Sequence, residues 1–481
     1  MNTRIISYVI SNLFKLMMFL LLFPLAVSVY YQEGLKLSMA YIIPIIILGV
    51  SSYFLSNKAP ENQSFFSKEG LVIVALSWLL ISFFGALPFV ISGDIPNMID
   101  AFFESVSGFT TTGATILPEV ESLNKSIIFW RSFTHWIGGM GVFVLILAIL
   151  PMTDSSLHIL KAESPGPSVG KLVPKIRDTA KILYMIYIAM TLIQIVLLCL
   201  AKMPFFDALT ISFGSAGTGG FGIKNDSMAS YSTTIQLITT IFMILFGVNF
   251  NAYYCLLGKN KKAIFKMEEV AWYFIIIFTC ITVIAINTRG YYENILMAIH
   301  HAAFQVGSVI TTTGYSTVNF DLWPQLSKTV MVIIMFIGAC AGSTGGGIKV
   351  SRIIIIFKMV KQEIYSYIHP KSVKLIRLDQ KPLEHSLTRS VAIFMLTYTL
   401  IFVLSMVVLA FDNKDMITNF TAVTATLNNI GPGLGDVGPM GSFAVFNPVC
   451  KLVLAFCMLA GRLELYPMLI IFSPQLWKIR R

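Results

Sequence analysis

Charged residues are scarce in this sequence. Only 12% of its 481 residues are Asp, Glu, Lys or Arg, whereas 56% are hydrophobic and the chain contains 37 Phe and 23 Met. A soluble protein of this length carries about twice that fraction of charge, and a disordered chain lacks so many apolar side chains. The composition therefore excludes soluble, fibrous and disordered classes, and favours a protein whose solvent is lipid.

Cysteine and histidine are also few and scattered. The six Cys form no CxxC pair, and the adjacent His300 and His301 would point in different directions on a helix. This spacing argues against zinc sites and disulfide frameworks, and the sequence offers no nucleophile and base constellation for an intramembrane enzyme. We therefore expect a chain that is not an enzyme and holds no cofactor. The net charge of +11 does not indicate nucleic acid, because the sequence contains no soluble basic domain.

Hydrophobic runs long enough to cross about 30 Å of hydrocarbon are frequent. Ten such runs lie near residues 5–30, 38–56, 70–92, 126–150, 180–201, 233–257, 270–288, 328–358, 390–411 and 448–474. The first could instead be a signal peptide, because Arg4 precedes it and residues 26–28 resemble a cleavage site. Since Lys15 interrupts this run and a second run follows at once, a membrane span is favoured.

The distribution of Lys and Arg predicts the orientation in the membrane. Segments 151–181, 258–269, 349–389 and 475–481 hold 21 of the 35 basic residues, so they and both termini are expected in the cytoplasm. The alternate loops hold six basic residues against twelve carboxylates, and this external face should concentrate cations. The basic segment 349–389 could dock a regulatory partner or anionic lipid, although basic residues beside a span usually only set topology.

A short apolar stretch followed by a Thr/Gly-rich run occurs four times. The segments read DAFFESVSGFTTTGAT, DALTISFGSAGTGGFG, HHAAFQVGSVITTTGYST and TAVTATLNNIGPGLG. Aligned on Gly113, Gly220, Gly314 and Gly431, they are separated by 107, 94 and 117 residues. A period of about 100 residues, in which each unit reads span, short helix, loop and span, indicates an internal repeat.

This periodicity predicts an all-α integral membrane protein with four tandem repeats around a pseudo-fourfold pore. An N-terminal two-span hairpin is expected at 1–69, followed by repeats at 70–176, 177–267, 268–388 and 389–481. Non-helical backbone at membrane depth is tolerated only where protein or a water-filled cavity surrounds it, so the four loops should converge.

The composition of the loops suits a cation. Glycine permits backbone conformations that aim carbonyl oxygens toward an axis, and threonine adds hydroxyl groups. Rings of carbonyls can replace the hydration shell of a monovalent cation, and the C-terminal ends of the short helices add a negative potential. The alternative is an ordinary re-entrant turn that needs glycine for a tight bend. Four copies in register favour an ion filter.

The repeat with TTTGA at 110–114 resembles the Trk/Ktr/HKT superfamily of potassium transport proteins. The N-terminal hairpin, NNIGPGLG at 428–435, GSTGGG at 342–347 and GRLE at 461–464 are similar to its bacterial TrkH type. The resemblance implies potassium uptake across the inner membrane through a gated, channel-like pore. It also implies a homodimer and a cytosolic TrkA-type nucleotide-binding regulatory subunit. A secondary transporter driven by a sodium or proton gradient is the alternative, but all four loops are expected to enter from the same side, unlike inverted repeats.

The resemblance assigns three potassium-binding filter residues to each repeat. These are Thr111, Thr112, Gly113, Thr218, Gly219, Gly220, Thr312, Thr313, Gly314, Asn429, Ile430 and Gly431. The strands are not identical, because the second has Gly where the first and third have Thr, and the fourth has no Thr. Such an asymmetric filter is expected to discriminate potassium from sodium or rubidium less strongly than the TVGYG filter of potassium channels.

Segment 328–358 is longer than one span requires, and a glycine-rich run interrupts it. A broken helix is expected there, and the resemblance implies that this run lies across the pathway as a gate. The gate residues are Gly342, Ser343, Thr344, Gly345, Gly346 and Gly347, together with Arg462. The alternative for the run is close helix packing through small residues.

Charged side chains inside spans are expensive and usually face a cavity or a partner. We expect Arg462 to face the pore and raise a barrier to potassium, with an ion pair to Glu464 or another carboxylate as the alternative. For Arg131 and His135, one helical turn apart, a structural role is favoured. Residues 433–438 match GxGxxG, but they follow no soluble strand, so no nucleotide site is expected.

Overall fold

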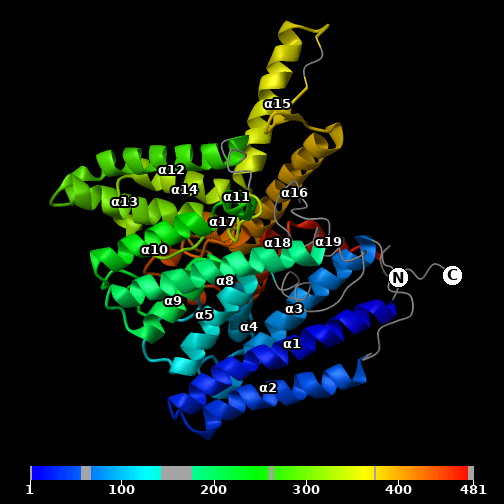
Figure 1. The fold of residues 1–481 in the computed structure, drawn as a ribbon, viewed down its shortest axis with the longest axis vertical. Helices are drawn as coiled ribbons and strands as arrows, with labels where there is room; N and C mark the ends of the chain where they lie inside the picture. The colour runs from blue at the N-terminus through cyan, green and yellow to red at the C-terminus, as the bar shows by residue number, and fades with distance from the viewer. Residues whose placement is uncertain are drawn as a thin grey trace.

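The computed structural model describes residues 3–55, 67–141, 176–258, 264, 266–372 and 375–474, which are predominantly helical (Figure 1). The helices are α1 (Thr3–Tyr30), α2 (Leu35–Phe54), α3 (Ser67–Ser92), α4 (Met98–Phe109), α5 (Lys125–Gly139), α8 (Ile176–Leu200), α9 (Phe205–Gly217), α10 (Thr233–Phe246), α11 (Phe250–Leu257), α12 (Glu268–Asn287), α13 (Ile295–Ile310), α14 (Gln325–Ile337), α15 (Val350–Ile368), α16 (His385–Ala410), α17 (Met416–Leu427), α18 (Pro448–Arg462) and α19 (Tyr466–Ile471). Short 3₁₀ helices lie at Arg289–Tyr291, Phe320–Leu322, Gly435–Val437 and Phe443–Val445. The strands β1 (Arg377–Leu378) and β2 (Lys381–Pro382) pair antiparallel.

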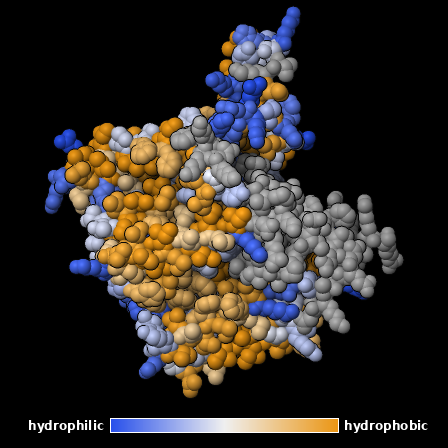
Figure 2. Space-filling model, viewed as in Figure 1, coloured by the Kyte–Doolittle hydropathy of each residue, from blue (hydrophilic) through white to orange (hydrophobic). Residues whose placement is uncertain are grey.

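The long helices carry mainly apolar side chains and expose many of them. Within the described ranges, six helices are long and apolar enough to cross a membrane, namely α1, α2, α3, α8, α12 and α16, and a seventh results if α10 and α11 count as one bent span. Figure 2 shows a broad hydrophobic surface over the body, with hydrophilic side chains gathered at the loop ends and on the projecting α15. The predicted class of all-α integral membrane protein is thereby confirmed.

The N-terminal helices α1 and α2 form a hairpin that packs on α3, while α1 also packs on α5. A buried hydrogen bond of 3.0 Å between the hydroxyl groups of Ser11 and Ser52 joins the two helices of the hairpin. The four short helices α4, α9, α13 and α17 lie inside the body, each packed against longer neighbours. The longer helices therefore surround the four loops that follow the short ones.

The expected span 233–257 is not one straight helix. Its two parts, α10 and α11, meet at an angle of 92°. The side chain of Asn249 accepts a hydrogen bond of 2.9 Å from the amide of Asn251 and so starts a new helix there. A side chain at Gly247 would overlap the hydroxyl group of Tyr273. The apolar character of the segment continues through the bend, which is why hydropathy alone predicted a continuous span.

Three other expected spans also differ from straight helices. The broken helix predicted for segment 328–358 is confirmed, because the segment is divided between α14 and α15, with the non-helical residues 338–349 between them. Segment 448–474 is divided between α18 and α19. In segment 126–150, α5 ends at Gly139, and residues 142–150 lie outside the described part of the chain. Each interruption follows a helix of 13 to 15 residues, so the helices after the four loops have similar lengths.

Candidate functional site

The four short helices deliver their loops to the buried centre of the protein. Side chains accept hydrogen bonds from the first turns of three of them, at Asn97 for α4, Asn294 for α13 and Asp415 for α17. Pro204 precedes α9 instead. The C-terminal turns of all four are fully buried. Their partly negative carbonyl ends therefore converge in the protein interior.

Each short helix ends in the same backbone turn. One residue in each turn has a left-handed conformation with φ of 55–60°: Thr111, Thr218, Thr312 and Asn429. The next residue donates its amide to the carbonyl five residues earlier, at 2.8–2.9 Å: Thr112 to Ser107, Gly219 to Gly214, Thr313 to Ser308 and Ile430 to Ala425. This is the turn that commonly ends a helix with glycine. A side chain in this conformation costs about 1–2 kcal/mol, and such strain persists where the surroundings enforce it.

The four aligned glycines form a closed ring of contacts between loops. All four have positive φ, between 71° and 97°. A side-chain carbon on any one of them would overlap a carbonyl oxygen of the next loop: Gly113 that of Gly219, Gly220 that of Thr313, Gly314 that of Ile430, and Gly431 that of Thr112. The fourth contact returns to the first loop, so the ring is complete. Only glycine satisfies both the conformation and the spacing.

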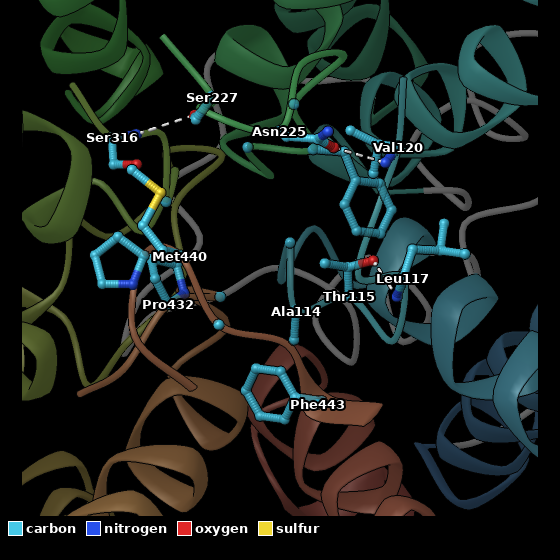
Figure 3. A pocket seen from close by; sticks show the side chains of 18 of the residues that line it. Ala114, Thr115, Leu117, Val120, Asn225, Ser227, Ser316, Pro432, Met440 and Phe443 are labelled. Atoms are coloured by element: carbon cyan, nitrogen blue, oxygen red, sulfur yellow. Dashed lines mark hydrogen bonds between the residues drawn. The ribbon is translucent and has the colours of Figure 1, made fainter. Parts of the chain in front are cut away.

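A cavity opens on one side of this ring, and Figure 3 shows it lined by residues from all four loops. Its lining includes the four ring glycines. Hydrogen bonds of 2.8–3.2 Å join neighbouring loops around it: the amide of Val120 to Asn225, that of Met228 to Ser316, that of Gly435 to Asp321, and that of Phe443 to Thr115. These hydrogen bonds link the four loops in a second closed ring, on the cavity side of the glycines, and they fix the shape of the cavity.

The charged groups of this cavity are a small part of those on the loops, in which carboxylates outnumber basic residues. Among the described residues, its lining contains Arg131 and Lys224 but no Asp or Glu. Nearby loop carboxylates accept backbone hydrogen bonds instead, as Glu121 does from the amide of Asn225 at 2.9 Å. The negative potential at the ring therefore comes mainly from carbonyl oxygens and helix ends.

The non-helical residues 338–349 lie on the opposite side of the ring. The amide of Gly346 donates to the Thr312 hydroxyl oxygen at 2.6 Å. A side-chain carbon on Gly345 would approach the carbonyl oxygen of Thr311 to 2.8 Å. The hydroxyl group of Thr344 bonds to a carbonyl at the end of α10, that of Phe246, at 3.2 Å. The predicted gate run thus lies against the end of α10 and against the loop that follows α13.

Both ends of this segment are fixed by Glu269, a residue in the first turn of α12 that is only 8% exposed. Its carboxylate accepts the amide of Ala341 at 2.7 Å and that of Ser351 at 3.1 Å. The buried ammonium group of Lys349 donates to the carbonyl of Gly345 within the segment. Sequence reasoning missed Glu269 and Lys349, although a carboxylate at the start of one span and a lysine inside another were visible signals.

Arg462 spans the space between the gate segment and α5. Its Nη1 donates to the carbonyl of Thr344 at 2.8 Å, and its Nη2 donates to the carbonyls of Gly138 and Gly139 at 2.5 and 2.7 Å. The side chain is buried. A cation is favoured at the C-terminal end of a helix such as α5 because the helix dipole is negative there.

Glu464, the alternative partner considered for Arg462, forms an ion pair with Arg352. The guanidinium group of Arg352 also lies 4.0 Å from the ring centroid of Phe394. The carboxylate next to the end of α18 therefore pairs with Arg352, a residue that the sequence analysis did not single out. The hydrogen bonds of Arg462 to Thr344, Gly138 and Gly139 connect the gate segment with the end of α5 through backbone carbonyls.

These features define a class of protein: an α-helical membrane protein in which four re-entrant loops close a ring. The family model for TrkH, described as a cation transport protein, matches residues 35–479. The chain therefore belongs to the TrkH family of cation transport proteins, as the sequence motifs indicated. This family is a class of transporters rather than of enzymes.

Individual relatives match along their full lengths. The chain is 36% identical over 486 residues to the Trk system potassium uptake protein TrkH of Escherichia coli K12, covering 99% of this chain and 100% of that protein. It is 32% identical over 491 residues to the Trk system potassium uptake protein TrkG of the same organism, with the same coverage. The crystal structure of the potassium transporter TrkH from Vibrio parahaemolyticus superposes with a TM-score of 0.88 at 33% identity, covering 99% of this chain and 100% of that one.

Proposed function

We propose that this protein takes up potassium through a gated, channel-like pore whose axis passes through the ring of four glycines. The observation that carries the proposal is the closure of that ring, in which Gly431 of the last loop lies against Thr112 of the first. The printed names of the relatives, which are potassium uptake proteins, support potassium as the cargo.

The chemistry of the ring suits a monovalent cation. In each loop a left-handed residue and a left-handed glycine enclose one residue of ordinary conformation, and that residue's carbonyl lies at the contact between loops. Carbonyl oxygens in such a ring replace water around a dehydrated ion, and they need no carboxylate to do so. The three filter residues of each loop would form the potassium site.

The gate in this proposal is the segment 338–349 together with Arg462. The segment contacts the ends of α10 and α13, while Arg462 connects it to the end of α5. A fixed guanidinium charge below the filter repels a passing cation strongly where little water screens it. Opening would require the bonds from Gly346 to Thr312 and from Arg462 to Thr344 to break.

We further propose an inner-membrane orientation with the cavity outside and both termini in the cytoplasm, as the distribution of Lys and Arg predicts. The helix α15 would then project into the cytoplasm (Figure 1). Exposed apolar side chains such as Phe357 and Ile364 on this helix suit a docking surface for a TrkA-type regulatory subunit. A homodimer remains part of the proposal through the family resemblance.

The test is flux into proteoliposomes that contain the purified chain alone, with a membrane potential set and no other ion gradient. Potassium influx that follows the potential, with smaller sodium influx, supports the pore. A requirement for a sodium or proton gradient contradicts it and favours coupled transport. Flux that starts only when a cytosolic partner is added supports a pore whose control lies at the gate.

A further inference from the structure

A fully buried ion pair lies directly behind the filter. Glu104 belongs to the short helix α4, and Arg131 belongs to the following helix α5. The two residues are 0% and 1% exposed to solvent, respectively. The Nε and Nη2 atoms of Arg131 each lie 2.8 Å from Oε1 of Glu104. Two charges buried at this depth are stable only while both are present and their remaining hydrogen-bonding positions are filled.

Those remaining positions are filled by the strands that leave the glycine ring. Glu104 accepts the hydroxyl group of Thr115 at 2.9 Å and the amide of Ile116 at 3.0 Å, both just after Gly113. Arg131 donates to the carbonyl of Gly222, two residues after Gly220, at 3.3 Å. One ion pair therefore holds the strands of the first and second loops together.

The guanidinium group also contacts the second strand through its face. It lies 4.1 Å from the ring centroid of Phe221, within the range of an attractive cation–π interaction. The position of Arg131 is thus fixed by a carboxylate on one side and by an aromatic ring on the other. A lysine would lack both the planar fork and the stacking face.

His135, one turn further along α5, holds the same strand. The amide of Phe221 donates to its Nε2 at 3.2 Å, so this nitrogen carries a lone pair. Its Nδ1 must then carry the proton, which it donates to the carbonyl of Gly108 at 2.8 Å. The imidazole also lies against Gly219, where any side chain would overlap it. His135 therefore connects the end of α4 to the second filter strand.

Within three residues of their ring glycines, the third and fourth strands are held by neutral groups, and the carboxylate of Asp321 accepts the amide of Gly435 one residue further along the fourth strand. The hydroxyl group of Ser308 donates to the carbonyl of Tyr315 at 2.6 Å. Thr421 and Leu434 exchange two hydrogen bonds of 2.9 and 3.1 Å. The bracing of the ring is therefore asymmetric, with the charged bonds behind its first two strands.

We propose that Glu104, Arg131 and His135 are positioning residues that fix the first and second filter strands and so set the preference for potassium over sodium. This inference rests on the proposed function as a pore. Strands that are held in place keep their carbonyl oxygens at the spacing that suits potassium. Strands that have lost these bonds can move closer together and coordinate the smaller sodium ion. The three residues act through the strands: Arg131 also lines the cavity, but it is 1% exposed and its guanidinium group is bonded to Glu104 and to the carbonyl of Gly222.

The test is the potassium-to-sodium permeability ratio, taken from reversal potentials of reconstituted protein with the two ions on opposite sides. The variants are Glu104→Gln, Arg131→Met, the double variant with both changes, and His135→Phe. We expect each to lower the ratio by about tenfold, while potassium flux persists. Ser52→Ala, which removes a buried hydrogen bond in the N-terminal hairpin, is the control and should keep the ratio of the wild type.

The double variant separates loss of positioning from damage to the fold by an unpaired buried charge. It removes both charges at once, so it leaves neither buried charge unpaired and keeps the fold even where a single variant does not. A wild-type ratio in the double variant, or in all conducting variants, overturns the inference. A wild-type protein that carries no potassium current under any condition overturns the pore itself, whereas unchanged selectivity in conducting variants overturns only the assignment of these three residues.

Discussion

The backbone amide of Gly346 donates a hydrogen bond of 2.6 Å to the side-chain hydroxyl of Thr312. Gly346 lies in the interruption between α14 and α15, and Thr312 lies in the loop that follows α13. This bond joins two segments that are both non-helical at the buried centre. The proposed gate therefore contacts the proposed filter directly, so a movement of one segment can displace the other without an intermediate element.

Gly346→Ala is expected to increase potassium flux severalfold. The added carbon would overlap the carbonyl of Asn428 and lie 3.1 Å from Cβ of Asn429, so the segment would have to move away from the helix ends. Deletion of part of 342–347 should act in the same direction. Influx into proteoliposomes at a fixed potential measures the effect, and unchanged flux in well-folded protein would contradict the gate.

Gly220→Ala is expected to have the opposite result, namely loss of flux. The new side chain would overlap the carbonyl of Thr313 inside the ring, and φ of 71° is unfavourable for any residue but glycine. Gly290→Ala is the matched control, because a side-chain carbon there meets no atom within 4 Å. Equal flux in the two variants would show that the ring is not the path.

Arg462→Ala is expected to raise basal potassium leak severalfold. The substitution removes a buried cation and frees three carbonyls, those of Thr344, Gly138 and Gly139, to face a passing ion. Flux without any partner, together with the melting temperature in detergent, distinguishes the two roles. A lower melting temperature without added leak would mean that Arg462 only joins the segments structurally.

Much of the architecture could be predicted because it depends on local pattern. Apolar length located the hairpin and the long spans, and the Thr/Gly runs located all four loops, including the register of Gly113 and Gly431. The turn before each glycine is set by the helix end just before it, which is a local property of the chain.

The remaining features depend on contacts between distant segments. The bend at Gly247 was missed because apolar residues continue through it. The pair of Glu104 with Arg131 joins residues 27 positions apart, and the pair of Arg352 with Glu464 joins residues 112 apart. No periodicity relates such residues, so the sequence shows the buried charges without showing their partners.

Glu269→Leu is expected to destabilise the closed position of the gate segment and increase leak. The substitution removes the acceptor of two buried amides, those of Ala341 and Ser351, at about 1–3 kcal/mol for each unsatisfied group. Opening the segment to water would satisfy both amides, so the open position is favoured. Glu268→Ala, at the neighbouring and partly exposed ion pair with Lys358, is the control and should change flux much less. Equal leak in the two variants would contradict a specific role for Glu269.

Asp415 is expected to make the stability of the fourth short helix depend on pH. Its carboxylate caps α17, accepting the amides of Ile417 and Thr418 at 3.0 Å. Hydrogen bonds from the Thr418 side chain and backbone lower the pKa of Asp415 below its ordinary value of 3.8. The stabilisation is therefore complete above the unfolded-state pKa, and is lost as pH falls through the lower folded-state pKa.

The comparison of Asp415→Asn with Asp415→Ala tests this cap. Asparagine caps a helix about as well as aspartate but does not titrate, whereas alanine at this position costs about 0.5–2 kcal/mol. Near neutral pH the Asn variant should therefore unfold close to the wild-type temperature, and the Ala variant below it. In acid the wild type should lose stability relative to the Asn variant, because only the carboxylate is neutralised by protons. Thermal unfolding in detergent at about pH 6 and about pH 3 measures this difference. Parallel losses in wild type and Asn variant would assign the acid sensitivity to other groups, since the two proteins differ only in whether this cap can be protonated.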